Sequence, residues 1–190
     1  MESLFSFLAE GFDLPILQWI AQNLRCGFLD AVMPVITVLG DAGIFWIAVA
    51  LILLCIPKYR RIGFAMGAAL LMGLLICNVT IKPLFARIRP YDYLFQEHGI
   101  TVQLLISAQH DFSFPSGHTA ASFEAATALM LYRKKWSIPA MVLAALIAFS
   151  RLYLFVHYPT DVLFSIGLGV LLGWAAYRLT EAVAPKLKLQ

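Results

Sequence analysis

Charged residues are scarce in this chain. They make up only 13% of its 190 residues, whereas 61% are hydrophobic. Soluble domains carry roughly 25% charged residues and about half apolar ones. A chain this short cannot hide so much apolar surface in a single core. The shortage of charge therefore excludes an ordinary soluble domain and predicts one membrane-embedded domain over residues 1–190.

Cysteine and clustered acids are also scarce, which limits metal chemistry. The chain has three cysteines, and none of them forms a CxxC pair, so we expect neither a zinc site nor a structural disulfide. Asp92, Glu97 and Asp111 are scattered over one loop, without the spacing of a two-metal site. We expect no metal ion and no cofactor.

The first ten residues lack a basic stretch, so we expect no cleavable signal peptide.

Long apolar runs predict the fold. A spanning helix needs about 20 mostly apolar residues, and five stretches qualify: about 28–57 with a break at Gly40-Asp41, 62–85, 116–132, 136–155 and 160–179. The segment before Arg25 mixes apolar and polar residues, which favours an interfacial helix over residues 1–26 and leaves a sixth span as the alternative. The expected fold class is all-α, a polytopic membrane bundle of five or six helices with its core at residues 28–181.

Basic residues predict the orientation, because they favour the cytoplasmic ends of spans. They gather after the first, third and fifth spans, at Lys58, Arg60 and Arg61, at Arg133, Lys134 and Lys135, and at Arg178, Lys186 and Lys188. Alternating spans place all three groups on one side. We expect that side to be the cytoplasm, with the loop at about 86–115 on the opposite side.

Three polar clusters fall on the side away from the basic loops. The first, Lys82 to Pro90, ends the second span. The second, Phe114 to His118, opens the third span, and the last, Ser150 to Asp161, joins the fourth span to the fifth. We expect the three clusters to meet at one membrane face.

Phosphate is the ligand that these clusters suit. Lys82, Arg89 and Arg151 supply three cations, and charges near membrane depth usually mark function. Arg binds phosphate oxygens as a bidentate fork, and Lys binds them as a point charge. Ser116 and Gly117 at a helix start offer a hydroxyl and free backbone N–H groups, which suit an anion. The pattern predicts a phosphoryl site.

Two histidines would supply the chemistry. Asp161 follows His157 by four residues across a helix start, where its carboxylate can accept the Nδ1 proton and leave Nε2 as a nucleophile. His118 comes from another helix, has no acid at comparable spacing, and could protonate the leaving oxygen.

Together the clusters read KxxxxxxRP, PSGH and SRxxxxxHxxxD, and the chain resembles the type 2 phosphatidic acid phosphatase superfamily at every signature position. The resemblance extends over about residues 40–180. It implies a phosphohistidine intermediate on His157 oriented by Asp161, with His118 as general acid. It also implies phosphate binding by Lys82, Arg89, Ser116, Gly117 and Arg151, and an active site on the non-cytoplasmic face of the cell membrane. The short loops look most like small bacterial undecaprenyl diphosphate phosphatases.

Several alternatives stay open. The lipid could instead be phosphatidylglycerophosphate or phosphatidic acid, because the motif residues bind the phosphate and do not distinguish one lipid tail from another. A haloperoxidase would share the pocket, but its relatives are soluble. A transporter or scaffold with a dead site would show gaps in the motifs, and there are none. The expected partners are a lipid phosphate or diphosphate and membrane lipids, without nucleic acid; the oligomeric state is not predicted.

Glu124 is interpreted as a snorkelling or internally paired carboxylate rather than as a contact to the site.

Overall fold

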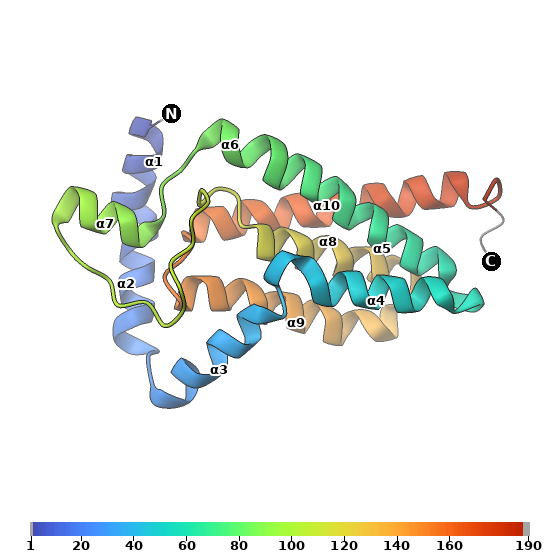
Figure 1. The fold of residues 1–190 in the computed structure, drawn as a ribbon, viewed down its shortest axis with the longest axis horizontal. Coiled ribbons are helices and arrows are strands. Elements are labelled where there is room, and N and C mark those ends of the chain that lie inside the picture. The colour runs from blue at the N-terminus through green and yellow to red at the C-terminus, as the bar shows by residue number, and fades with distance from the viewer. Residues whose placement is uncertain (1, 188–190) are drawn as a thin grey trace.

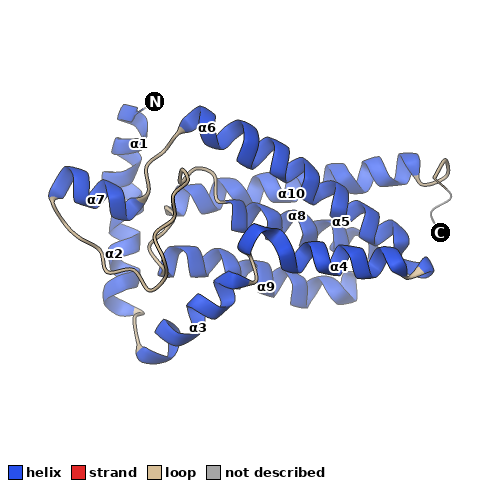
Figure 2. Cartoon of the chain, in the orientation of Figure 1, coloured by secondary structure: helices blue, strands red, loops and turns tan. Residues whose placement is uncertain are grey.

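A computed structural model describes residues 2–187. Within this range the chain forms helices joined by turns and loops, without strands (Figure 2). The all-α prediction is confirmed. Lys188, one of the predicted cytoplasmic basic residues, lies outside the described residues.

Five helices run along the long axis of the molecule (Figure 1): α4 (Ile44–Cys55), α5 (Arg60–Gly73), α8 (Gly117–Tyr132), α9 (Lys134–Tyr153) and α10 (Pro159–Val183). The central helix is α8, which packs against α5, α9 and α10. Most of its residues are buried, and many are alanines. The apolar signal of this segment is weak because α8 faces other helices rather than lipid.

Glycines bring α8 and α10 into close contact. A Cβ atom on Gly173 of α10 would lie 2.5 Å from the carbonyl oxygen of Glu124, and one on Gly169 would lie 2.8 Å from that of Ala120. Small residues at such positions allow two membrane helices to approach each other closely, so that they gain packing and backbone contacts. The central helix α8 is therefore packed closely against α10 along these positions.

The outer surface of the bundle is apolar. Large hydrophobic side chains are exposed along its helices, among them Leu51, Ile52, Leu71, Val142, Leu163 and Leu171. Within the described residues, four helical segments are long and apolar enough to cross a membrane, and a bent pair would add a fifth. Such a surface suits lipid as the surrounding solvent.

The bent pair comprises α3 (Gly27–Val38) and α4, which meet at 43°. A short 3₁₀ turn, η2 (Asp41–Gly43), separates them, and Ala42 and Gly43 adopt positive φ angles of 48° and 67°. A helix cannot continue through two left-handed residues. The predicted break at Gly40-Asp41 is confirmed.

The second span changes its winding near the site. Helix α5 passes into a π-helical stretch, η4 (Leu74–Ile81), and then into the short α6 (Lys82–Phe85). Ala86 ends this helix with a φ of 46°. π-helical turns are rare and frequently lie at functional sites. Here the altered winding precedes Lys82 directly.

The N-terminal helices lie across the end of the bundle rather than along it (Figure 1). They are α1 (Glu2–Leu8), the π-helical η1 (Ala9–Asp13) and α2 (Leu14–Asn23). The segment Leu4–Asn23 is long and apolar enough to span a membrane. Its direction across the bundle axis nevertheless favours the interfacial placement. On this side α7 (Pro90–His98) lies next to it, and Tyr93 donates a hydrogen bond of 2.9 Å to Glu10.

The basic segments lie together at the opposite end. Arg61 of α5 is 3.8 Å from Glu181 of α10, and Tyr132 of α8 donates a 2.8 Å hydrogen bond to the same carboxylate. The ring of Tyr59, in the 3₁₀ turn η3 (Pro57–Tyr59), packs edge to face against Trp136 with centroids 4.9 Å apart. The fold thus gathers the predicted cytoplasmic loops at one end.

Candidate active site

The three polar clusters meet at the other end of the bundle (Figure 1). The first follows η4, the second opens α8, and the third joins α9 to α10. Contacts join them directly: Arg89 of the first cluster lies against His157 of the third, and Ser113, next to the second, bonds to Asp161. The predicted convergence is found in the structure.

His157 lies in the turn between α9 and α10 and is only 1% exposed. Its Nδ1 is 3.5 Å from Oδ2 of Asp161, and its Nε2 is 3.4 Å from Nη1 of Arg89. Burial lowers the pKa of His157 well below its usual value, and the charges of Arg89 and Arg151 act in the same direction. The ring is therefore uncharged at neutral pH, which is the form that can act as a nucleophile.

Asp161 is held by three donors at the start of α10. It accepts hydrogen bonds from the Tyr158 N–H at 3.0 Å, from the Ser113 hydroxyl at 2.5 Å and from Arg87 at 2.5 Å. Its distance to His157 is longer than an ordinary hydrogen bond. The carboxylate thus faces Nδ1 from a fixed position, and its orienting role stays a prediction.

Arg87 lies inside the first cluster, but its position in the motif predicts no role for it. Its guanidinium is buried and bridges Asp161 to Asp13 of the N-terminal helix, the second contact being 2.7 Å. It also donates to the Thr160 hydroxyl at 2.8 Å and lies 3.7 Å from the ring centroid of Tyr158. One cation therefore offsets two buried carboxylates and ties the N-terminal helix to the site. Its position inside the first cluster was the only sequence signal for it.

Two of the predicted phosphate-binding cations contact an acid. Lys82 and Arg89 both donate to the carboxylate of Asp111, Arg89 at 2.5 Å, and Arg89 also donates to the Val156 carbonyl at 2.6 Å. Burial disfavours the charged form of Asp111, but the charges of Lys82 and Arg89 outweigh it and hold the pKa of this carboxyl well below its usual range. A carboxylate therefore occupies the position that the sequence assigns to phosphate.

Arg151 has more hydrogen-bond donors than partners. Its Nη1 donates to the Thr37 hydroxyl at 2.5 Å, whereas its Nε and Nη2 have no hydrogen-bond partner although they are buried. Unsatisfied buried donors are costly, and each calls for an explanation. An arriving anion would satisfy both.

The prediction for the start of α8 is partly wrong. The backbone N–H of Ser116 is not free, since it donates to the Ser165 hydroxyl of α10 at 2.8 Å. The Ser116 hydroxyl is buried and lies 3.0 Å from that of Thr119. The backbone N–H and the hydroxyl of Ser116 are therefore engaged in contacts within the helix bundle. Gly117 does line the cavity described below.

His118 has an acidic partner, although none lies nearby in the sequence. Its Nε2 is 2.7 Å from Oδ1 of Asp41, which the break between α3 and α4 brings to the site. The same break places Gly40 against the ring: a Cβ there would lie 2.7 Å from Cδ2 of His118. The break therefore positions the second histidine.

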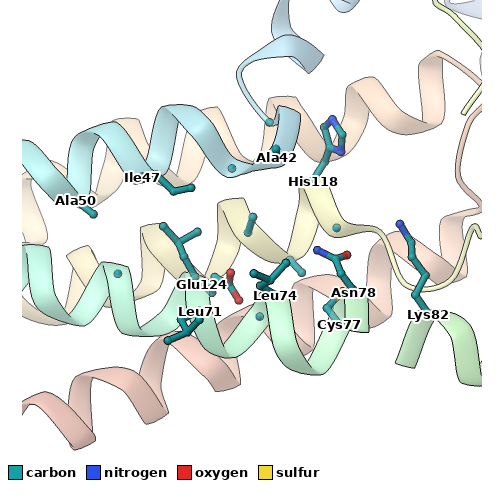
Figure 3. A pocket seen from close by; sticks show the side chains of 18 of the residues that line it. Ala42, Ile47, Ala50, Leu71, Leu74, Cys77, Asn78, Lys82, His118 and Glu124 are labelled. Atoms are coloured by element: carbon teal, nitrogen blue, oxygen red, sulfur yellow. The ribbon is translucent and has the colours of Figure 1, made fainter. Parts of the chain in front are cut away.

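A cavity of about 500 Å³ opens beside His118 (Figure 3). Lys82, Asp111 and His118 line its polar end, and it extends between α4 and α5 along apolar residues that include Ile47, Leu51, Leu71 and Leu74. These apolar side chains are themselves exposed. The cavity therefore has a polar end at the charged groups and an apolar part between the two helices.

The interpretation of Glu124 is wrong. This residue lines the cavity below His118 (Figure 3), yet it is only 1% exposed, so it does not snorkel. Its Oε2 has no hydrogen-bond partner, so it is not internally paired at that oxygen. The pattern of α8 gave no sign that this position would face a cavity.

Comparison with known proteins gives a consistent result. A sequence profile of the PAP2 superfamily matches residues 58–184, a range that includes all three clusters. The undecaprenyl-diphosphatase of Sulfolobus acidocaldarius is 27% identical over 95% of this chain and 84% of its own length. The undecaprenyl-diphosphatase BcrC of Bacillus subtilis is 30% identical over 85% of this chain and 80% of its own length.

Solved structures agree with the sequence relatives. A transmembrane PAP2 type phosphatidylglycerolphosphate phosphatase from Bacillus subtilis superposes with a TM-score of 0.73. The two chains are 27% identical, and the match covers 96% of this chain and 89% of the other.

Proposed function

Because this chain belongs to the PAP2 superfamily, we propose that it hydrolyses undecaprenyl diphosphate to undecaprenyl phosphate at the non-cytoplasmic face of the membrane. That it is a membrane lipid phosphatase follows from the family and from its relatives. The choice of lipid is supported by the names of the two relatives above, which cover most of this chain. The choice of face is supported by the basic loops at the far end of the bundle.

The observation that carries the proposal is the unused guanidinium edge of Arg151 beside an uncharged His157. Both side chains are buried, and the charge of Arg151 acts on the histidine ring. A phosphoryl group bound to the free N–H groups would place its phosphorus within reach of Nε2. Lys82 and Arg89 would then bind the remaining oxygens in place of Asp111.

The reaction has two steps. His157 Nε2 forms a bond to phosphorus while the bond from phosphorus to the leaving oxygen breaks, and His118 donates a proton to that oxygen. Water then attacks phosphorus while the bond from phosphorus to His157 Nε2 breaks; His118 accepts the proton of the water, and phosphate leaves. Asp161 keeps the Nδ1 side of His157 next to a negative charge throughout, which stabilises the imidazolium as it forms.

Metal independence is part of the proposal. The three cations supply the charge that a metal ion would otherwise supply. Among residues 2–187, no three His, Cys, Asp or Glu side chains are grouped so that they could hold an ion. Full activity in EDTA is the expected result, whereas activity lost in EDTA and restored by Mg²⁺ would contradict this part.

Phosphate release from a panel of purified lipids tests the function. We expect release from undecaprenyl diphosphate and strong inhibition by orthovanadate, whose five-coordinate form resembles the transferring group. Inactivity on undecaprenyl diphosphate would overturn the proposed choice of lipid, whichever other lipid is hydrolysed. A phosphatidylglycerophosphate phosphatase is the second candidate, favoured by the structural match over 96% of this chain.

A further inference from the structure

Glu124 is an ionisable side chain in the bundle to which the reaction above gives no role. It lies on α8, six residues after His118, and it lines the same cavity (Figure 3). At about 1.5 Å per residue, the backbone of Glu124 lies roughly 9 Å deeper along the helix than that of the histidine. It therefore faces the part of the cavity that a lipid would enter just below its phosphate.

The surroundings of the carboxyl group are apolar. Leu70, Leu71 and Leu74 line this part of the cavity, and no ion pair involving Glu124 occurs within the described residues. Burying an unpaired carboxylate is far more costly than burying the neutral acid. The side chain is thus best accommodated as a carboxylic acid, which can donate one hydrogen bond through its hydroxyl group.

The neighbouring helix leaves room for this group. A Cβ atom on Gly73 of α5 would overlap both carboxyl oxygens, lying 2.3 Å from Oε1 and closer still to Oε2. Any larger residue at position 73 would have to displace the acid. In contrast, Gly67, one and a half turns earlier on the same helix and also lining the cavity, would meet no atom within 4 Å.

An incoming lipid would meet this donor just below its headgroup. The tail of a polyprenyl diphosphate is pure hydrocarbon beyond its two phosphates, so it offers no acceptor to Glu124. A glycerolipid phosphate carries acyl ester carbonyls one glycerol unit below the phosphate. Such a carbonyl accepts hydrogen bonds and would satisfy a donor that is otherwise buried without a partner.

We propose that Glu124 is a specificity-determining residue that hydrogen-bonds the ester carbonyl of a glycerolipid phosphate in this cavity. The inference rests on the proposed lipid phosphatase activity and states which residue would recognise a glycerolipid, the substrate class of the second candidate function. The enzyme then accepts ester-linked lipid phosphates better than equally long lipids that lack the carbonyl, because only the former satisfy the acid.

A matched substrate pair tests the assignment. Dioleoyl phosphatidic acid and its diether analogue have the same headgroup and tails, but only the former has carbonyls. We expect the wild-type enzyme in detergent micelles to favour the ester by about five- to tenfold in kcat/KM, as one hydrogen bond would. In Glu124→Leu the ratio should fall to about one, and Glu124→Gln, which keeps a donor, should retain it.

Two glycine variants serve as a matched control. Gly73→Ala should lower the ester-to-ether ratio because the new methyl group displaces the carboxyl group, and Gly67→Ala should leave the ratio unchanged. A ratio measured within one preparation does not depend on the fraction of folded enzyme, so a poorly folding variant still gives a readable result.

The outcomes separate the two proposals. An equal ratio in the wild type and in Glu124→Leu would overturn the role of Glu124, as would hydrolysis confined to polyprenyl diphosphates. If the wild-type enzyme releases no phosphate from undecaprenyl diphosphate, the proposed function fails, whereas the role of Glu124 is still decided by the ester-to-ether ratio.

Discussion

At the scale of single residues, one carboxylate of the site offsets the charge of two of its cations. The carboxylate of Asp111 contacts both Lys82 and Arg89, and it is the side chain that a substrate phosphate would have to replace. It lies on the loop between α7 and α8, and it is more than half exposed, so it can move away without disturbing the bundle. Arg151, by contrast, keeps two donors open. In the proposed reaction, phosphate would therefore bind to the two unpartnered donors of Arg151 and would replace the Asp111 carboxylate at Lys82 and Arg89.

Neutralising Asp111 should strengthen anion binding. In Asp111→Asn, the inhibition constant for orthovanadate should fall by about tenfold, because a charged hydrogen bond worth about 1.5 kcal/mol no longer has to be broken. Since the pKa of Asp111 lies well below its usual range, the carboxylate persists as pH falls and is lost only in strong acid. The effect of the variant should therefore be the same at mildly acidic and mildly alkaline pH.

Asp92→Asn is the control for this experiment. It removes an acid from α7 that also lies near Arg89 but makes no ion pair with it within the described residues. Its inhibition constant should match that of the wild type. A higher inhibition constant in Asp111→Asn would mean that Asp111 positions the two cations rather than competing with phosphate.

The two histidines should respond differently to the leaving group. His157→Ala should abolish the phosphoenzyme with every substrate, because it removes the attacking nitrogen. His118→Ala should be slow with lipid esters, whose alkoxide needs a proton, and much less impaired with a phenolic leaving group that is already a weak base. The amount and the rate of phosphoenzyme formation should be measured by rapid quench for each variant with a lipid ester and with a phenyl phosphate substrate. Phosphoenzyme on His118 in the His157→Ala variant would reverse the assignment.

At the scale of secondary-structure elements, the break between α3 and α4 positions the side chain of His118. It places Asp41 in contact with His118 and packs Gly40 against the imidazole ring. We expect Gly40→Ala to push the ring out of place and to slow turnover by tenfold or more, since a shift of about 1 Å can cost about 100-fold. Gly27→Ala, at the start of α3 where a Cβ would meet nothing within 4 Å, is the control. Steady-state turnover of both variants decides; equal rates would contradict this role of the break.

The sequence predicted these elements better than the contacts between them. Apolar periodicity and the pair Gly40-Asp41 predicted where the first span breaks, and three motifs at span ends predicted where the site forms. The contacts of His118 with Asp41 and of Arg87 with Asp13 join residues 77 and 74 positions apart. No local pattern marks such pairs, because helix packing alone brings them together. The free N–H of Ser116 was wrongly predicted for the same reason: Ser165 reaches it from another helix.

The whole molecule separates its charges by end. The basic loops gather at one end, where Arg61 lies 3.8 Å from Glu181. At the other end, three acids are paired with cations of the first cluster: Asp13, Asp111 and Asp161. Between the two ends, the bundle presents apolar side chains to its surroundings. We expect this asymmetry to orient the protein in the membrane, because basic loops favour the cytoplasmic side. The proposed orientation would place the open end of the cavity within reach of lipid phosphates of the outer leaflet.

Cysteine labelling on intact cells tests this direction. The native cysteines must first be replaced, because Cys26 and Cys55 are exposed and would react themselves. In that background, Glu97→Cys on α7 should react with a membrane-impermeant maleimide added to intact cells, whereas Lys134→Cys at the start of α9 should react only after lysis. Both positions are exposed, so accessibility of the side chain does not bias the comparison. Labelling of Lys134→Cys but not Glu97→Cys in intact cells would invert the topology and place phosphate release in the cytoplasm.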